Sequence, residues 1–221
     1  MRIDPETFDF LKNIAENNNR EWFQANKHLH DKARENVIEF AGELIRQMHL
    51  VDPQVDADLD PKKCVLRIYR DIRFSPNKTP YKNNFGVSLP TTGSKPGGAE
   101  YYFQIQPGRS FIGGGYWMPE TPHLKKIRQE IDYNAGELKH IIDEPEFKKL
   151  FGEFRKQEQL KTAPREYNAD NENADLLKLK SFIGWHQIND KELTKSGAVE
   201  YLVKVCSKLY PLNVFLRNAI A

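Results

Sequence analysis

Basic, phenolic and carboxylate side chains are concentrated in one short stretch of the chain, from Arg67 to Tyr81, with the sequence RIYRDIRFSPNKTPY. Guanidinium groups bind phosphate or carboxylate oxygens through paired N–H donors, a lysine adds a point charge, and a tyrosine hydroxyl adds a further donor. An aspartate among them can orient an arginine or accept a proton. These residue types indicate a site for a phosphorylated or otherwise anionic small molecule, in an enzyme or in a binding protein. The candidate ligand-binding residues are Arg67, Arg70, Arg73 and Lys78, and the candidate catalytic residues are Asp71 and Tyr81.

The charge of the whole chain is almost balanced, but the charge around this stretch is not. The 221 residues include 33 Lys and Arg against 31 Asp and Glu, a formal net charge of +2. Between Pro61 and Lys82, however, seven basic residues accompany a single acidic one. A local excess of this density attracts anions, unless acidic residues from elsewhere in the fold neutralise it.

Two other hypotheses use the same residues. In the first, the basic residues and nearby aromatic side chains bind nucleic acid, with an affinity that falls steeply with salt. The isoelectric point of about 8.4 favours this less than the small-molecule site, since strong nucleic-acid binders often exceed 9. In the second, the arginines form a structural or protein-interaction network with helix acids such as Glu35, Glu39 or Glu43.

The stretch itself is predicted to begin as a β-strand. Apolar and polar residues alternate with a period of two from Leu66 to Phe74. On such a strand Arg70 lies on the apolar face, between Ile68 and Ile72. Burying an unpaired guanidinium costs several kcal/mol. We therefore expect Arg70 to have an acidic partner, to reach solvent at a sheet edge, or to contact a ligand.

The elements that must position this stretch begin with two predicted helices. Asp4 followed by Pro5 is typical of an N-cap with proline in the first turn. The run Asn17–Asn19 ends the first helix, and Asn18 with Glu21 resembles a capping box for a second, long helix.

Strands and further helices follow along the chain. Short connections between consecutive strands favour an antiparallel sheet. Helices, then strands, then helices predict an α+β fold in one domain over residues 1–221, with a central antiparallel sheet of about four to six strands packed by N- and C-terminal helices. The expected strands begin at Phe85, Tyr101, Ser110 and Ser181, and the expected helices begin at Thr121, Asp143, Ala174 and Ser196, with Pro211 kinking or restarting the last one.

Two further segments allow a structural and a functional interpretation. Trp22 and Phe23 are expected to pack in the core or at a helix cap, whereas the functional alternative places Asn19, Arg20 and Trp22 at the edge of the basic site. The glycines of Gly113–Gly115 suit close backbone packing better than phosphate binding, because the context of a phosphate-binding loop is missing.

Several classes of protein are excluded or not indicated. No run of about 18 apolar residues exists, so no membrane span is expected. The first residues lack an apolar export signal, which predicts a cytosolic protein, and the distant cysteines Cys64 and Cys206 are expected to be reduced. The histidine spacing favours no metal site, and the residues identify neither a cofactor nor an oligomeric state.

The sequence resembles the bacterial domain-of-unknown-function family 2461, conserved hypothetical proteins of about this length. Besides the basic stretch from Arg67 to Tyr81, the resemblance includes the segments Asn18–Phe23, Gly113–Pro119 and Pro211–Leu212. The resemblance covers nearly the whole chain and implies no particular reaction, although it favours a functional role for the basic stretch. The family motif R-x-x-R-D-x-R-F followed by Lys and Tyr is matched by Arg67, Arg70, Asp71, Arg73, Phe74, Lys78 and Tyr81.

Overall fold

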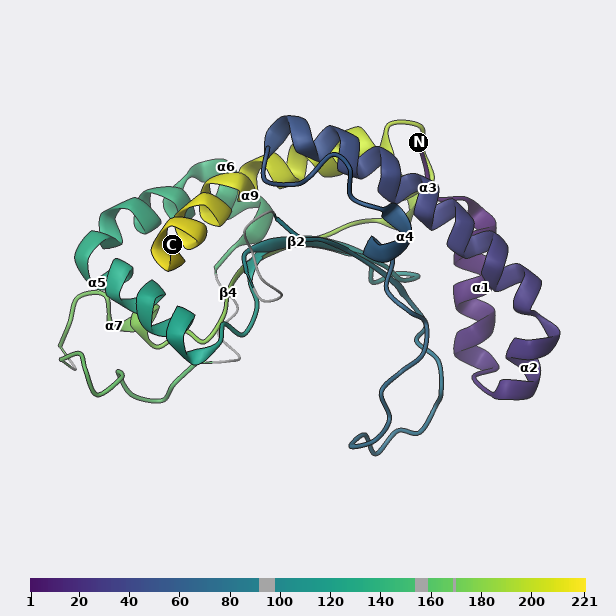
Figure 1. Cartoon of the computed structure of the whole chain (residues 1–221), viewed down its shortest axis with the longest axis horizontal. Helices are drawn as coiled ribbons and strands as arrows, with labels where there is room; N and C mark the ends of the chain where they lie inside the picture. Colours follow the sequence, from purple (N-terminus) through teal and green to yellow (C-terminus); the bar gives the residue numbers. More distant parts are fainter. Residues whose placement is uncertain (92–97, 154–158, 169) are drawn as a thin grey trace. The chain divides into compact units, whose positions relative to one another are not determined.

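The computed structural model describes residues 1–91, 98–153, 159–168 and 170–221 (Figure 1). Within these ranges the chain combines helices with a four-stranded antiparallel sheet, which confirms the predicted α+β class. The sheet has the order β1-β2-β3-β4, so strands that follow one another along the chain are hydrogen-bonded neighbours. The strands are β1 (Phe85–Leu89), β2 (Glu100–Ile105), β3 (Phe111–Tyr116) and β4 (Phe182–Gln187).

The chain forms two compact units. The first contains residues 1–89, 102–112 and 187–204, and the second contains residues 90–101, 113–186 and 205–221. The stretch that carries the candidate site belongs entirely to the first unit. Neither described unit contains a helix that is long and apolar enough to span a bilayer.

The first unit begins with the helices that the sequence predicts, but their boundaries differ. They are α1 (Pro5–Glu16), α2 (Arg20–Ala25), α3 (Lys27–Val51) and α4 (Pro61–Cys64). The expected long second helix is thus divided near Asn26. Its N-cap is Asn19, whose side chain accepts a hydrogen bond from the Trp22 backbone N–H at 2.8 Å, and the expected capping residue Asn18 has another role.

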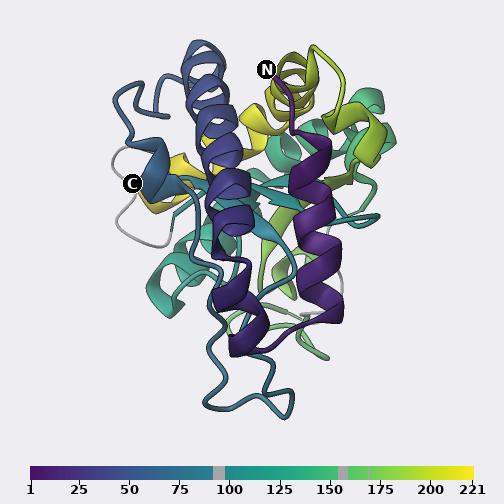
Figure 2. The same cartoon turned by 90° about the vertical axis from the view of Figure 1, so that its right-hand side faces the viewer.

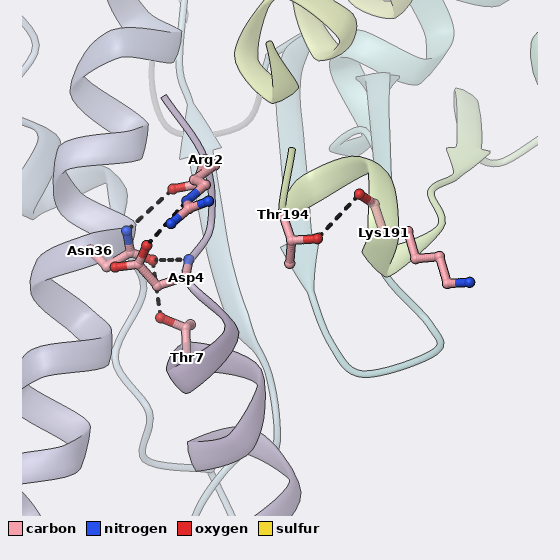
Figure 3. Close-up of polar contacts among 6 residues, drawn as sticks. All are labelled: Arg2, Asp4, Thr7, Asn36, Lys191 and Thr194. Carbon is pink, nitrogen blue, oxygen red and sulfur yellow. Dashed lines mark hydrogen bonds and ion pairs between the residues drawn. The ribbon is translucent and has the colours of Figure 1, made fainter. Parts of the chain in front are cut away.

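A buried amide ties the N-terminus to α3 (Figure 3). The Oδ1 atom of Asn36 accepts hydrogen bonds from the Asp4 backbone N–H at 2.9 Å and from the Thr7 hydroxyl at 3.0 Å. Its Nδ2 atom donates to the Arg2 carbonyl at 3.3 Å. Asp4 is the N-cap of α1, as predicted, although its side chain makes no capping bond. These contacts fix α1 against α3, the scaffold on which α2 is held.

The segment from Leu66 to Phe74 is not a strand, which corrects the sequence prediction. It is the outgoing limb of a long loop, residues 66–84, which we call the arm and which projects from its unit in both views (Figures 1 and 2). The limbs share one isolated bridge, Tyr69–Tyr81, and a second bridge, Val65–Val87, joins the residues just outside the arm. A regular ladder needs a backbone donor at alternate positions, and the prolines at positions 76 and 80 have none.

The second unit contains α5 (Thr121–Asp143), α6 (Pro145–Phe151) and α7 (Ala174–Leu177). The short helix α8 (Asp190–Leu193) belongs to the first unit, and α9 (Ala198–Ile220) continues through Pro211 instead of ending there. Gly115, with φ +123°, lies so close to β4 that an added Cβ would be 2.0 Å from the Phe182 carbonyl oxygen. The glycine run therefore serves close strand packing, as expected. Cys64 and Cys206 are both free and buried.

Candidate functional site

A cavity of about 370 Å³ lies where the base of the arm meets α2. This volume falls within the range of small-molecule sites, roughly 300–1,000 Å³. No Asp, Glu, His or Cys belongs to its lining, so no carboxylate there competes with a bound anion and no metal-ligating side chain is present. The lining consists of Arg20 and Gln24 from α2 and of Tyr69, Arg70, Ile72, Pro80 and Tyr81 from the arm, and we call it the arm cavity.

Asn18 fixes the arm to the start of α2. Its Nδ2 atom donates to the Tyr81 carbonyl at 2.9 Å, and its Oδ1 atom accepts from the Tyr81 N–H at 3.0 Å. The Tyr81 ring is buried and stacks on the Phe23 ring, with 4.2 Å between the ring centroids. The Asn19 cap sets the start of α2 and hence the position of Arg20. The two walls of the cavity are therefore held together by an asparagine clamp and an aromatic stack.

Arg70 satisfies its guanidinium with neutral oxygens. Nη1 donates to the Thr79 carbonyl at 3.0 Å and to the Thr79 hydroxyl, and Nη2 donates to the Ser75 hydroxyl at 3.3 Å. None of these partners is an acid, so the alternative in which Arg70 pairs with a helix acid has no support among the described residues. A guanidinium has five N–H donors. Arg70 uses three of them within the arm, and the other two have no partner among the described residues.

The other polar groups of the lining have no partner in the described part of the chain. The side chains of Arg20 and Gln24 and the hydroxyls of Tyr69 and Tyr81 make no hydrogen bond or ion pair there. Burial raises the pKa of the Tyr81 hydroxyl, and Tyr69 and Glu21 raise it further, whereas Arg20 lowers it in part. Tyr81 is therefore protonated at neutral pH and can donate a hydrogen bond. Two guanidiniums and two hydroxyls surround the cavity with unused donors.

Three of the predicted site residues shape the tip of the arm and lie outside this lining. Arg73 donates from Nε and Nη2 to the two carboxylate oxygens of Asp71, at 3.0 and 2.7 Å. This ion pair lowers the pKa of the exposed Asp71 carboxyl, which makes Asp71 a weak base. Lys78 donates from Nζ to the Ile72 carbonyl at 2.9 Å.

Arg67, the remaining candidate, is exposed and does not line the arm cavity. Of the six predicted residues, Arg70 and Tyr81 are brought together there. Arg20, Gln24 and Tyr69 complete the set, and Arg20 was anticipated only as an edge residue of the basic site. The four-residue spacing of Arg20 and Gln24, which puts both on one face of a helix, is the local signal for that pair.

Metal binding has no support in the residues that the structure describes, where no group of three His, Cys, Asp or Glu side chains is placed to hold an ion. A family model described as "Conserved hypothetical protein (DUF2461)" matches residues 6–215 of the chain. This span includes every residue of the arm cavity. No curated protein and no solved structure matches the chain.

Proposed function

Because the chain belongs to the DUF2461 family of conserved hypothetical proteins, we propose its function from the geometry of the arm cavity: it binds an anionic, phosphorylated small molecule. The observation that carries this proposal is the pairing of two guanidiniums, Arg20 and Arg70, around a cavity whose lining contains no carboxylate. Each retains N–H donors that no protein oxygen occupies. A phosphate satisfies such donors in bidentate geometry.

The remaining walls indicate what else the ligand carries. The lining includes the apolar side chains of Ile72 and Pro80 and the ring of Tyr69, which suit an organic group next to the anion. The cavity is several times larger than a phosphate group. An organic phosphate therefore fits it better than the inorganic ion does.

The geometry supports binding more directly than it supports a reaction. Tyr81 lines the cavity with a protonated hydroxyl, so it can donate a hydrogen bond or a proton to a ligand oxygen. Asp71 lies outside the lining and is held by Arg73. The assignment of Asp71 and Tyr81 as catalytic residues stays a prediction, as does a cytosolic location.

A purely structural role accounts for part of the motif. The three hydrogen bonds of Arg70 brace the arm, and so do the contacts of Asp71, Arg73 and Lys78. Of the two arginines that line the arm cavity, Arg20 is the one that this explanation leaves out, because it makes no hydrogen bond or ion pair in the described part of the chain. Its position on the cavity favours a ligand.

A thermal-shift panel tests the proposal. It contains sugar phosphates, nucleotides, pyrophosphate, inorganic phosphate and dicarboxylates, with Arg20→Gln and the surface control Lys125→Gln beside the wild type. A ligand at 100 times its dissociation constant stabilises the fold by about 2.7 kcal/mol. We expect an organic phosphate to raise the melting temperature of the wild type and the control, and to leave Arg20→Gln unchanged. An equal shift in Arg20→Gln, or no shift with any organic phosphate, would overturn the proposal.

A further inference from the structure

The tip of the arm displays an aromatic side chain to solvent. Phe74 is 93% exposed, the largest value among the large hydrophobic residues of the described chain. The guanidinium of Arg73 lies 5.8 Å from the centre of its ring. Tyr69, closer to the base of the arm, is 51% exposed. An apolar ring held in water at the end of a projecting loop has no role in the core, and it indicates a surface that meets a partner.

Contacts within the arm brace the loop that carries this ring. The Lys78 ammonium bonds to the Ile72 carbonyl across the tip, and the Thr79 N–H donates to the Asn77 side chain at 2.9 Å. Arg70 joins the two limbs through Thr79 and Ser75. A preformed loop loses little conformational entropy on binding. The arm is therefore built to present Phe74 and not only to connect α4 with β1.

Positive charge runs along the whole length of the arm. Arg67 and Lys82 lie towards its base, and Arg73 and Lys78 near its tip, whereas Asp71 is the single acid from residue 66 to residue 84. The side chains of Arg67 and Lys82 make no hydrogen bond or ion pair to the chain as described. Burial lowers the pKa of the Lys82 ammonium, and the nearby Arg67 charge lowers it further. Asp71 is the one acid of the arm, and Arg67 acts on it electrostatically, but Arg73 already pairs with it. The excess of positive charge that remains favours an anion bound beside Arg67 and Lys82.

We propose that the arm binds single-stranded nucleic acid, with a base stacked on Phe74 and with Arg67, Lys78 and Lys82 at the phosphates. Exposed aromatic rings combined with a track of cations are the features that bind single strands without sequence preference. An anionic membrane fits less well, because a membrane-inserting loop needs its cations only behind the apolar tip, whereas these extend to the base. The inference goes beyond the proposed small-molecule function and gives the nucleic-acid hypothesis a place and a mode of contact.

The test is fluorescence anisotropy with a labelled oligothymidylate of about 12 nucleotides, titrated at several salt concentrations. We expect Phe74→Ala to weaken binding about 5- to 150-fold without changing the salt dependence, since it removes stacking alone. Arg67→Gln is expected to reduce the slope of log affinity against log salt by about 0.7, the value for one phosphate contact on a single strand. The Arg67 side chain makes no hydrogen bond or ion pair in the described chain, so this substitution removes neither kind of contact from the fold.

Matched controls come from the second unit. Tyr133→Ala removes an aromatic ring that is 73% exposed on α5, and Lys125→Gln removes an exposed cation from the same helix. Neither is expected to alter the affinity. Absence of binding at low salt, or equal losses in Phe74→Ala and Tyr133→Ala, would overturn the proposal. Binding to phosphatidylserine vesicles without binding to the oligonucleotide would replace it with a membrane surface. Arg20→Gln keeps its affinity for the oligonucleotide, so this proposal and the arm-cavity proposal fail separately.

Discussion

Replacing Asn18 with serine separates the two roles that this residue can have. A serine caps a helix about as well as an asparagine does, so Asn18→Ser is neutral if the residue serves as the N-cap that the sequence predicts. In the structure, however, Asn18 uses both amide atoms on the Tyr81 backbone, 63 positions away, at 2.9 and 3.0 Å. A serine hydroxyl cannot reproduce this two-atom clamp.

The cost follows from those two contacts. Each hydrogen bond contributes about 0.5–1.5 kcal/mol net, so losing both destabilises the fold by about 1–3 kcal/mol. This is a substantial share of the roughly 5–15 kcal/mol that holds a native protein together. Because Asn18 fixes the arm to α2, the substitution is also expected to weaken binding of an organic phosphate in the arm cavity.

Urea unfolding monitored by circular dichroism measures the effect, with Asn19→Ser as the matched control. Asn19 caps α2 through its side chain, a role that serine fulfils, so its substitution is expected to change stability by less than about 0.5 kcal/mol. A neutral Asn18→Ser together with a destabilising Asn19→Ser would contradict the assignment of the clamp and the cap.

Three further predictions concern the strand packing, the core and the arm tip. Gly115→Ala is expected to destabilise the fold by more than about 1 kcal/mol in urea unfolding, because the methyl group would collide with the Phe182 carbonyl at a positive φ; a stability equal to wild type would contradict this packing. Asn213→Leu is expected to raise stability by about 1–3 kcal/mol, since both side-chain polar atoms of Asn213 are buried without a partner among the described residues; a loss in the same assay would show that they are satisfied. Arg73 lowers the pKa of the Asp71 carboxyl in the folded protein. The ion pair therefore stabilises the arm tip fully at pH values above the ordinary carboxyl pKa, and this stabilisation is lost as the pH falls through the lower pKa of the folded state. NMR titration of the carboxyl group measures this pKa, and an ordinary value would contradict the ion pair.

Periodicity was sufficient to predict most elements, and the arm shows where it fails. The alternation from Leu66 to Phe74 predicts buried apolar side chains, but only Ile68 is buried, whereas Leu66 is 37% and Phe74 93% exposed. The alternating pattern gives no information on whether the opposite limb has the backbone N–H donors that a β-ladder needs. Prolines 76 and 80 on the return limb prevent a regular ladder, and the limbs share one isolated bridge. The alternating pattern therefore predicted a strand where the chain forms a braced loop.

The sequence predicts the chemical kind of the candidate site, but only some of the residues that line it. Arg70 and Tyr81 lie in the basic stretch, so residue chemistry identified them. Arg20 and Gln24 join them because Asn18 connects positions 63 residues apart, and local spacing holds no information on such contacts. The N-cap of α2 is Asn19 and not the predicted Asn18, for a related reason. Either asparagine can cap a helix, but the side chain of Asn18 is bonded to the Tyr81 backbone of the arm.

The central claim is that Arg20 and the arm cavity recognise the anionic group of an organic phosphate. Isothermal titration calorimetry tests it most directly, with one organic phosphate and its unphosphorylated parent compound, on the wild type and on Arg20→Gln. A hydrogen bond to a charged group contributes about 1.5–3 kcal/mol, which corresponds to about 10- to 150-fold in affinity. We expect the wild type to prefer the phosphate by at least this factor and Arg20→Gln to lose most of the preference. An equal affinity of the wild type for both compounds, or an undiminished preference in Arg20→Gln, would contradict it.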